Sequence, residues 1–272
     1  REDWAELADE DLLDLRMADL PLAIEGTLAQ RIAQLRSELD ERGLLFPLHF
    51  YISDEWFTPD GATAIAVPFY LAQPRLERLE ESQMFEAEGG EYEWGMRILR
   101  HEAGHAIDNA YKLRLRRARR ETFGLPSKAY PEFYTPKPYS KSSVRRLDTW
   151  YAQRHPDEDF AATFAGWVTP NSEWHHRYAG WKALPKLEYM DALMGSLRDV
   201  PARHRSMRAV FDHSWRLLSE LERALFSRLA VFRGGCTAAA AEQVSGATLQ
   251  ELAALVDKSL LRRRRRGGAQ TI

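Results

Sequence analysis

Two histidines and a glutamate stand at a spacing that could hold a metal ion. The stretch RILRHEAGHAIDNAY (97–111) places His101 and His105 four residues apart, with Glu102 directly after the first histidine. Residues four apart on a helix share one face, so both imidazoles can point a nitrogen at a common ion. Glu102 lies beside them, where its carboxylate can take a proton from a metal-activated water. This H-E-x-x-H pattern predicts a zinc site with two histidine ligands and a general base.

The bare pattern leaves one alternative open, which is a solvated helix face carrying two ordinary histidines. The chain has eight histidines, so the pattern can arise by chance. Ala103, Gly104 and Ala106 favour the metal site, because small residues let another segment approach the helix closely beside the ligands. A catalytic zinc ion also needs a third protein ligand and one open position. We expect that ligand to come from a separate helix.

The segment HPDEDFAATFAGW (155–167) offers the third ligand. A proline followed by three acidic residues makes a favourable helix start, and this alone is enough to account for the carboxylates. In the functional interpretation Glu158 faces inward, with two phenylalanines packing around the site. Asp159 is the second candidate. His155 is a weaker candidate because it precedes the helix.

Hydrophobic periodicity and turn residues predict the elements that would position these groups. A small sheet between helices, with no alternation of strand and helix, indicates an α+β fold and not a doubly wound one. Pro68 places the second strand at a sheet edge or a strand end. The expected elements are helices at 6–20 and from Thr27 to the stop at Gly43, strands at 45–53 and 62–71 around a turn at 58–61, a long helix at about 91–121, a loop at 125–143, and helices at 144–153, 158–168 and 181–198.

Charge is unevenly distributed along a chain whose formal net charge is −2. Residues 1–95 hold 7 Lys/Arg against 22 Asp/Glu, a net −15, and the other 177 residues hold 31 against 18, a net +13. The near-neutral total does not favour binding of the whole protein to nucleic acid. The basic run YKLRLRRARR (111–120) is expected to continue the metal-site helix as a solvated or acid-paired face.

Cysteine content and hydropathy bear on the compartment. The single cysteine, Cys236, excludes an internal disulfide framework and favours a reducing, cytoplasmic location. No apolar run approaches the length of a membrane span, so no membrane association is expected. The first residues, REDWAELADEDLLDL, are acidic, which is unlike a signal peptide.

Several motifs together resemble a known family. H-E-x-G-H-A-x-D, followed some fifty residues later by E-x-F-A-x-x-F, resembles the gluzincin class of zinc metallopeptidases, and the catalytic domain of anthrax lethal factor shows a similar pairing. The stretches SDEWFTPDG, LRHEAGHAIDNAY, PKPYSK and HPDEDFAATFAGW resemble a bacterial family of zinc-binding metallopeptidases of unassigned substrate. The resemblance covers about residues 3–195. It implies a zincin-like domain at 1–195 that binds one Zn²⁺ and hydrolyses a peptide or protein substrate.

The resemblance also implies roles for individual residues. It makes His101, His105 and Glu158 the metal ligands and Glu102 the general base. Tyr151, seven residues before Glu158, would hydrogen-bond the developing oxyanion. Core packing is the alternative for this tyrosine and for three that compete for the role, which are Tyr130, Tyr134 and Tyr139.

Three further expectations follow from the same resemblance. Asp108, one turn beyond His105, would orient that imidazole, with ordinary surface placement as the alternative. The substrate would pair along an edge strand at 62–68. One position departs from the family pattern, because Ala162 stands where a second glutamate usually follows the ligand by one turn. Without this neighbour to support Glu158, either the activity would be lowered or the usual ligand assignment would not hold in full.

The last part of the chain has a different character. LRDVPARHRSMRAVFDHSWRLLSELERALFSRLAVFRGG and LQELAALVDKSLLRR resemble the helical, winged-helix-like segment that follows the nucleotide-binding domain in bacterial signal-transduction ATPases with numerous domains. This resemblance implies a small module at 196–266, either a natural fusion truncated before further domains or part of a composite, and a tail at 267–272. Nothing matches G-x-x-x-x-G-K-[ST], so ATP binding is not expected. RRRRR (262–266) is read as a solubilising tail or the start of a strand, with anionic partners as the alternative.

Two functional hypotheses therefore remain open. The first is a zinc-dependent metallopeptidase in which Glu102 acts as general base on a metal-activated water. The second is a regulatory or interaction protein with a vestigial zinc site, whose C-terminal module docks a partner. The sequence indicates no oligomeric state.

Overall fold

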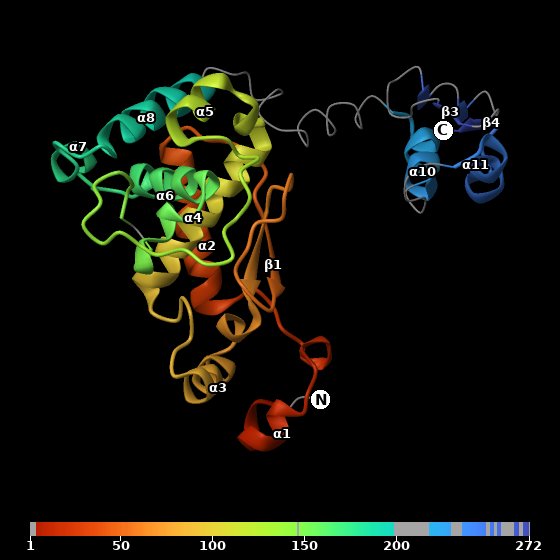
Figure 1. Cartoon of the computed structure of the whole chain (residues 1–272). Coiled ribbons are helices and arrows are strands. Elements are labelled where there is room, and N and C mark those ends of the chain that lie inside the picture. Colours follow the sequence, from red (N-terminus) through yellow and green to blue (C-terminus); the bar gives the residue numbers. More distant parts are fainter. Residues whose placement is uncertain are drawn as a thin grey trace. The chain divides into compact units, whose positions relative to one another are not determined.

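Two helices meet at the centre of the larger part of the molecule, and they carry the residues singled out above. In this computed structural model, α4 (Tyr92–Tyr111) lies between α2 (Gly26–Glu41) and α6 (Pro156–Val168), and α8 (Leu184–Arg198) packs on the far side of α6 (Figure 1). The structure describes residues 4–145, 147–198, 218–229, 236–248, 251–252, 255–256, 264–266 and 269–271. The chain divides into two compact units, Arg1–Ser206 and Met207–Ile272.

Helix α4 begins and ends for identifiable reasons. The Glu91 carboxylate accepts hydrogen bonds from the backbone N–H groups of Glu93 and Trp94, which satisfies two donors of the first turn. Lys112 then takes a left-handed conformation, with φ of 51°, and ends the helix. The expectation that 111–120 continues this helix is therefore wrong. The chain turns through η4 (Leu113–Leu115) and folds back as a separate helix, α5 (Arg117–Phe123).

Helix α6 is enclosed on all sides. All thirteen of its residues are buried, and its sequence is mainly Ala and Phe after the acidic first turn. The hydrogen-bond and charge requirements of its polar residues must therefore be met by neighbouring protein groups. On the other side of α4, the Arg100 guanidinium forms a buried ion pair with Glu38 of α2, at 2.6 Å. These contacts fix α4 between its two neighbours.

The two strands of the small sheet do not form the antiparallel hairpin that the turn between them indicates. Strands β1 (His49–Ser53) and β2 (Ala64–Pro68) run parallel, and the turn at 59–62 belongs to a crossover and not to a hairpin. On the other edge of β2, the Ala66 N–H donates to the Phe57 carbonyl at 2.8 Å. The expectation that a substrate pairs along 62–68 is wrong at Ala66, in the middle of that segment, because its N–H already pairs with Phe57. The mixed helix and small-sheet content agrees with the predicted α+β class.

The remaining elements of the first unit are short. Helix α2 begins at Gly26 and not at the expected cap Thr27. The segment 6–20 is not one helix, because it holds two short pieces, Asp9–Leu13 and Met17–Asp19, after a helical turn that ends at Glu6. No helix among the described residues is both long and apolar enough to cross a bilayer. The other elements are η1 (Trp4–Glu6), α1 (Asp9–Leu13), η2 (Met17–Asp19), η3 (Phe69–Ala72), α3 (Pro74–Met84), η5 (Asp148–Gln153) and α7 (Trp174–Arg177).

The second unit contains α10 (Glu220–Leu229), α11 (Ala238–Ser245) and the antiparallel strands β3 (Arg264–Arg266) and β4 (Ala269–Thr271). Within the expected tail at 267–272, residues Ala269–Thr271 form β4. The join near 194–200 continues into 199–217, which lie outside the described residues, as do Arg262 and Arg263. A small apolar core holds the helices together: Leu218, Leu225, Leu229, Ala241, Ala247, Leu252 and Leu255.

Candidate functional site

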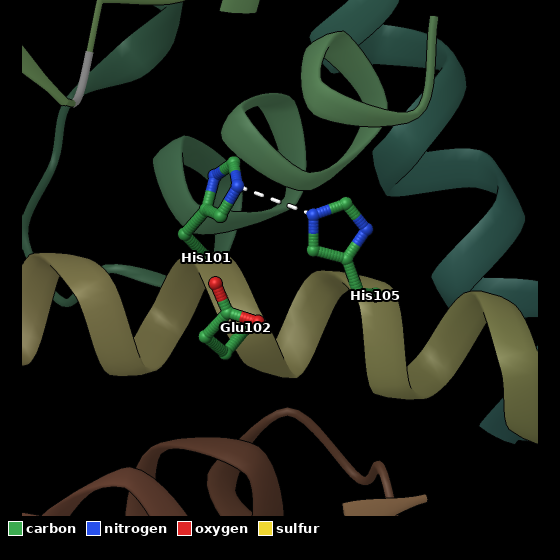
Figure 2. Close-up of side chains that lie close together, drawn as sticks. All are labelled: His101, Glu102 and His105. Atoms are coloured by element: carbon green, nitrogen blue, oxygen red, sulfur yellow. Dashed lines mark hydrogen bonds between the residues drawn. The ribbon is translucent and has the colours of Figure 1, made fainter. Parts of the chain in front are cut away.

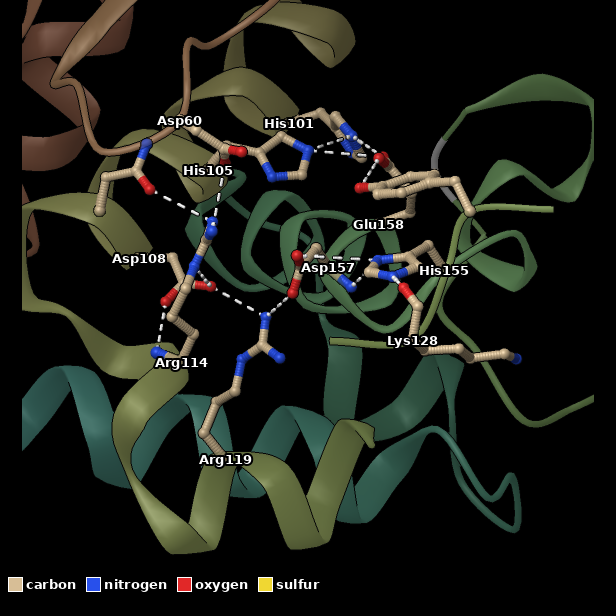
Figure 3. A network of polar contacts seen from close by, with 12 residues as sticks. Asp60, His101, His105, Asp108, Arg114, Arg119, Lys128, His155, Asp157 and Glu158 are labelled. Carbon is tan, nitrogen blue, oxygen red and sulfur yellow. Dashed lines mark hydrogen bonds and ion pairs between the residues drawn. The ribbon is translucent and has the colours of Figure 1, made fainter. Parts of the chain in front are cut away.

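The structure brings the three predicted ligands into one triangle. Glu158 Oε2 lies 3.0 Å from His101 Nε2 and 3.4 Å from His105 Nε2, and the two Nε2 atoms are 3.2 Å apart (Figures 2 and 3). All three side chains are buried or nearly so. Side chains of α4 and α6 therefore meet at one point, although His101 and Glu158 are 57 residues apart in the chain.

This triangle has the dimensions of a tetrahedral zinc site. Bonds of about 2.0–2.1 Å at tetrahedral angles place neighbouring ligand atoms roughly 3.3 Å apart. The three measured distances of 3.0, 3.2 and 3.4 Å bracket that value. Two imidazoles and one carboxylate, with a fourth position open, are also a ligand set that zinc takes in hydrolytic sites. The donor set therefore fits the ion.

The electrostatics of the triangle favour a positive charge at its centre. Burial alone would raise the pKa of the Glu158 carboxyl, but hydrogen bonds to His101 and His105 outweigh burial and hold it well below its usual range. Burial alone would lower the pKa of His105, but Glu158 and Glu102 raise it to about 9. The carboxylates thus hold a proton between the ligands, which a divalent cation would have to displace.

Glu102 belongs to the same cluster but is held to one side. Its ligand atoms and those of His101 and His105 lie within 4.8 Å of one another. The Thr58 hydroxyl lies 2.8 Å from Glu102 Oε2 and 3.1 Å from the Glu102 carbonyl, which ties the side chain to the loop before β2. Glu158, in contrast, lies within 3.4 Å of both Nε2 atoms through its Oε2. Sequence reasoning missed Thr58, although it lies in the SDEWFTPDG stretch that carries the family resemblance.

Two tyrosines flank the triangle with different hydrogen bonds. The Tyr130 hydroxyl donates to Glu158 Oε1 at 3.0 Å, and its ring stacks on His155 at 3.8 Å. The Tyr151 ring lies 6.0 Å from the His101 ring, and its hydroxyl accepts from Arg154 at 3.4 Å. Burial, followed by the charge of Glu158, raises the pKa of both phenols, so both keep their protons. The proton of Tyr130 is committed to Glu158, whereas that of Tyr151 remains available for another acceptor.

Two hollows meet at these residues. One, of about 460 Å³, is lined by His105, Glu158 and Tyr130, and the other, of about 630 Å³, is lined by His101 and three exposed glutamates. Both share Trp56, Glu102 and Tyr151 in their lining. Of the four tyrosines considered from the sequence, Tyr130 and Tyr151 are the ones that line these hollows, and Tyr139 is 96% exposed.

The alternative ligands have other partners. His155 caps α6, because its Nδ1 accepts from the Asp157 N–H at 3.1 Å while Nε2 lies 2.7 Å from the Lys128 carbonyl oxygen. Asp159 pairs with Lys186 at 2.5 Å. Neither position belongs to the triangle, so the preference for Glu158 among these candidates agrees with the geometry.

Asp108 does not have the role expected for it. Its carboxylate accepts from the Arg114 N–H at 2.7 Å and from Arg119 at 2.9 Å, and these contacts direct it away from His105. Ala162, which replaces the family's second glutamate, is buried with 2% exposure. Glu158 nevertheless has a donor on its second oxygen, because Tyr130 supplies one.

Comparisons with known proteins cover little of the chain. No protein-family model matches it, and no solved structure is significantly similar. Three curated proteins, one from Mycobacterium bovis and two from strains of Mycobacterium tuberculosis, are 41% identical over 76 residues, which is 25% of this chain and 9% of each relative. Each is named as a proposed HTH-type transcriptional regulator. The chain thus spans about 9% of the length of the curated relatives that it matches.

Proposed function

We propose that this protein is a zinc-dependent metallopeptidase with a zincin-like catalytic domain. One observation carries the proposal: Glu158 Oε2 lies within 3.4 Å of both His101 Nε2 and His105 Nε2, while Glu102 stands beside them and is held by Thr58. A solvated helix face with two ordinary histidines would require neither the buried carboxylate nor the triangular arrangement. The two hollows that meet at Glu102 leave room for a peptide on either side.

The chain's own groups divide the chemical work. When bound, zinc would polarise the scissile carbonyl and make a water molecule more acidic. Glu102 takes a proton from this water and delivers it to the leaving nitrogen, and the hydrogen bond from Thr58 to Oε2 leaves Oε1 for that transfer. The Tyr151 hydroxyl donates a hydrogen bond to the oxygen that becomes negative during attack.

The test combines metal removal with substitution of the base. The metal-loaded protein should cleave a mixed peptide library, a chelator should abolish cleavage, and zinc should restore it. Glu102→Gln should lower the rate by at least about 10²- to 10⁴-fold, the usual contribution of general acid–base catalysis, with one zinc still bound. Glu121→Gln, an exposed position on α5, is the matched control and should keep full activity. Full activity in Glu102→Gln would remove the assigned base.

The partial sequence match supports a second candidate. The relatives' names concern transcriptional regulation, and their matched segment is 25% of this chain. In this alternative the zinc site is vestigial and the C-terminal module docks a partner. The absence of any turnover with zinc fully bound would favour it, and a DNA mobility shift that survives moderate salt would point to a nucleic-acid partner.

A further inference from the structure

A buried arginine links the two helices that supply the ligands. Arg119 Nη2 donates to Asp108 Oδ2 at 2.9 Å and to Asp157 Oδ1 at 2.5 Å (Figure 3). Asp108 lies three residues after His105 on α4, and Asp157 directly precedes Glu158 on α6. Arg119 Nη2 therefore bridges α4, which carries His101 and His105, to the first turn of α6, which carries Glu158.

The bridge is held in place at each end. The Asp108 carboxylate is anchored by the Arg114 N–H at 2.7 Å, so that end cannot swing freely. The Arg119 side chain has no exposed surface, and its guanidinium carbon lies 5.0 Å from the centre of the Phe160 ring of α6. A shift of α6 along α4 would have to break one of the two Nη2 contacts, and the same shift would carry Glu158 away from the imidazoles.

A gain in stability does not explain why the Arg119 guanidinium is buried here. Arg119 Nε and Nη1 are buried and have no hydrogen-bond partner among the described residues. Burying a guanidinium with unpaired N–H groups is unfavourable, and a buried ion pair often gives no more stability than apolar side chains of the same size. Its two carboxylate partners, in contrast, come one helical turn after His105 on α4 and directly before Glu158 on α6.

We propose that Arg119 is a positioning residue that sets the register of α6 on α4, so that the Glu158 carboxylate meets the two imidazoles. The inference rests on the proposed zinc site and concerns how the protein assembles it. Removal of the guanidinium would leave Asp108 and Asp157 without the cation between them. Their repulsion would then move the first turn of α6 and distort the ligand triangle.

The experiment measures metal binding, not turnover. Zinc affinity of the full chain is determined by competition with a chromogenic chelator, and the cobalt-substituted protein is examined by visible absorption, which reports ligand geometry. Arg119→Met should weaken zinc binding about 10- to 100-fold, as loss of supporting contacts to metal ligands usually does, and should change the cobalt spectrum. Asp157→Asn, which keeps the side-chain shape, should weaken zinc binding in the same direction and serves if Arg119→Met does not fold.

Arg100→Met is the matched control, because it breaks another buried ion pair of α4 on the side away from α6. It should lower the unfolding temperature of the metal-free protein while leaving the zinc affinity and the cobalt spectrum unchanged. Wild-type affinity and spectrum in a folded Arg119→Met or Asp157→Asn protein would overturn the positioning role and leave the zinc site standing. A wild-type chain that binds no zinc would overturn both proposals.

Discussion

The glycine inside the HEAGH motif allows a test of how closely the ligand helices must approach. A Cβ atom added at Gly104 would lie 2.8 Å from Ala161 Cα, 3.0 Å from the Ala161 carbonyl oxygen and 3.2 Å from Ala161 Cβ. The shortest of these distances is about 0.6 Å below the 3.4 Å at which ordinary contact begins. Two of the three opposing atoms belong to the α6 backbone and cannot rotate away. Gly104→Ala must therefore push α6 from α4 near Glu158, which is three residues before Ala161.

The magnitude follows from two opposing effects. Overpacking of a filled interior costs about 1–3 kcal/mol. Alanine in the middle of a helix gains about 0.5–1 kcal/mol over glycine, so the net loss for Gly104→Ala should be about 0–2.5 kcal/mol. Gly195, in α8, is the matched control, because a Cβ atom there would meet nothing within 4 Å. Gly195→Ala should show the helix gain alone and stabilise the protein by about 0.5–1 kcal/mol.

The assay is urea unfolding of the metal-free proteins, with the free energy of unfolding compared at equal m-values. Zinc affinity is then measured on the same samples, and only Gly104→Ala should show a loss. A gain in stability for Gly104→Ala equal to that of Gly195→Ala, with wild-type zinc affinity, would refute the argument from close helix approach.

Three further substitutions separate the roles of individual groups. Tyr151→Phe should lower kcat by about 10²- to 10³-fold, as loss of an oxyanion donor does, with zinc affinity unchanged; an unaltered kcat would exclude the role. Tyr130→Phe removes the donor to Glu158 and should weaken zinc binding about tenfold or more in chelator competition, so wild-type affinity would contradict it. Hydrogen bonds from two backbone N–H groups lower the pKa of the Glu91 carboxyl from 4.5, so its stabilisation of α4 is present above pH 4.5 and is lost as the pH falls through the lower folded-state pKa. Glu91→Gln should therefore lower the unfolding temperature at neutral pH and have little effect in acid, and a difference that does not vary with pH would refute this account.

Patterns in the local sequence located part of the candidate site but not the residues that hold its side chains in place. Helical spacing alone places His101 and His105 on one face, and the pair is found there. The preference for Glu158 over Asp159 rests on an expected inward face beside two phenylalanines and on the family resemblance, because acidity alone makes the carboxylates in the first turn of α6 equivalent. Thr58 and Arg119 reach the site through tertiary contacts, which no periodicity in their own segments indicates.

The errors in the predicted secondary structure have a similar origin. The break at Lys112 uses a left-handed residue that is not glycine, so the usual stop signal is absent and the helical pattern of the sequence continues to Gly124. The turn before β2 has the composition of a hairpin, but strand direction depends on where the chain crosses over. A pattern of apolar and polar residues does not contain that information.

The complete enclosure of α6 restricts how this protein can vary. Because all thirteen residues are buried, a change of size or polarity at any of them would disturb a packed neighbour or the polar cluster. A deep mutational scan should show an uninterrupted block of intolerance from 156 to 168, in contrast to the periodic pattern of tolerated and rejected positions that a half-exposed helix such as α3 would give. Divergent descendants of this chain would therefore accumulate most of their differences outside α6.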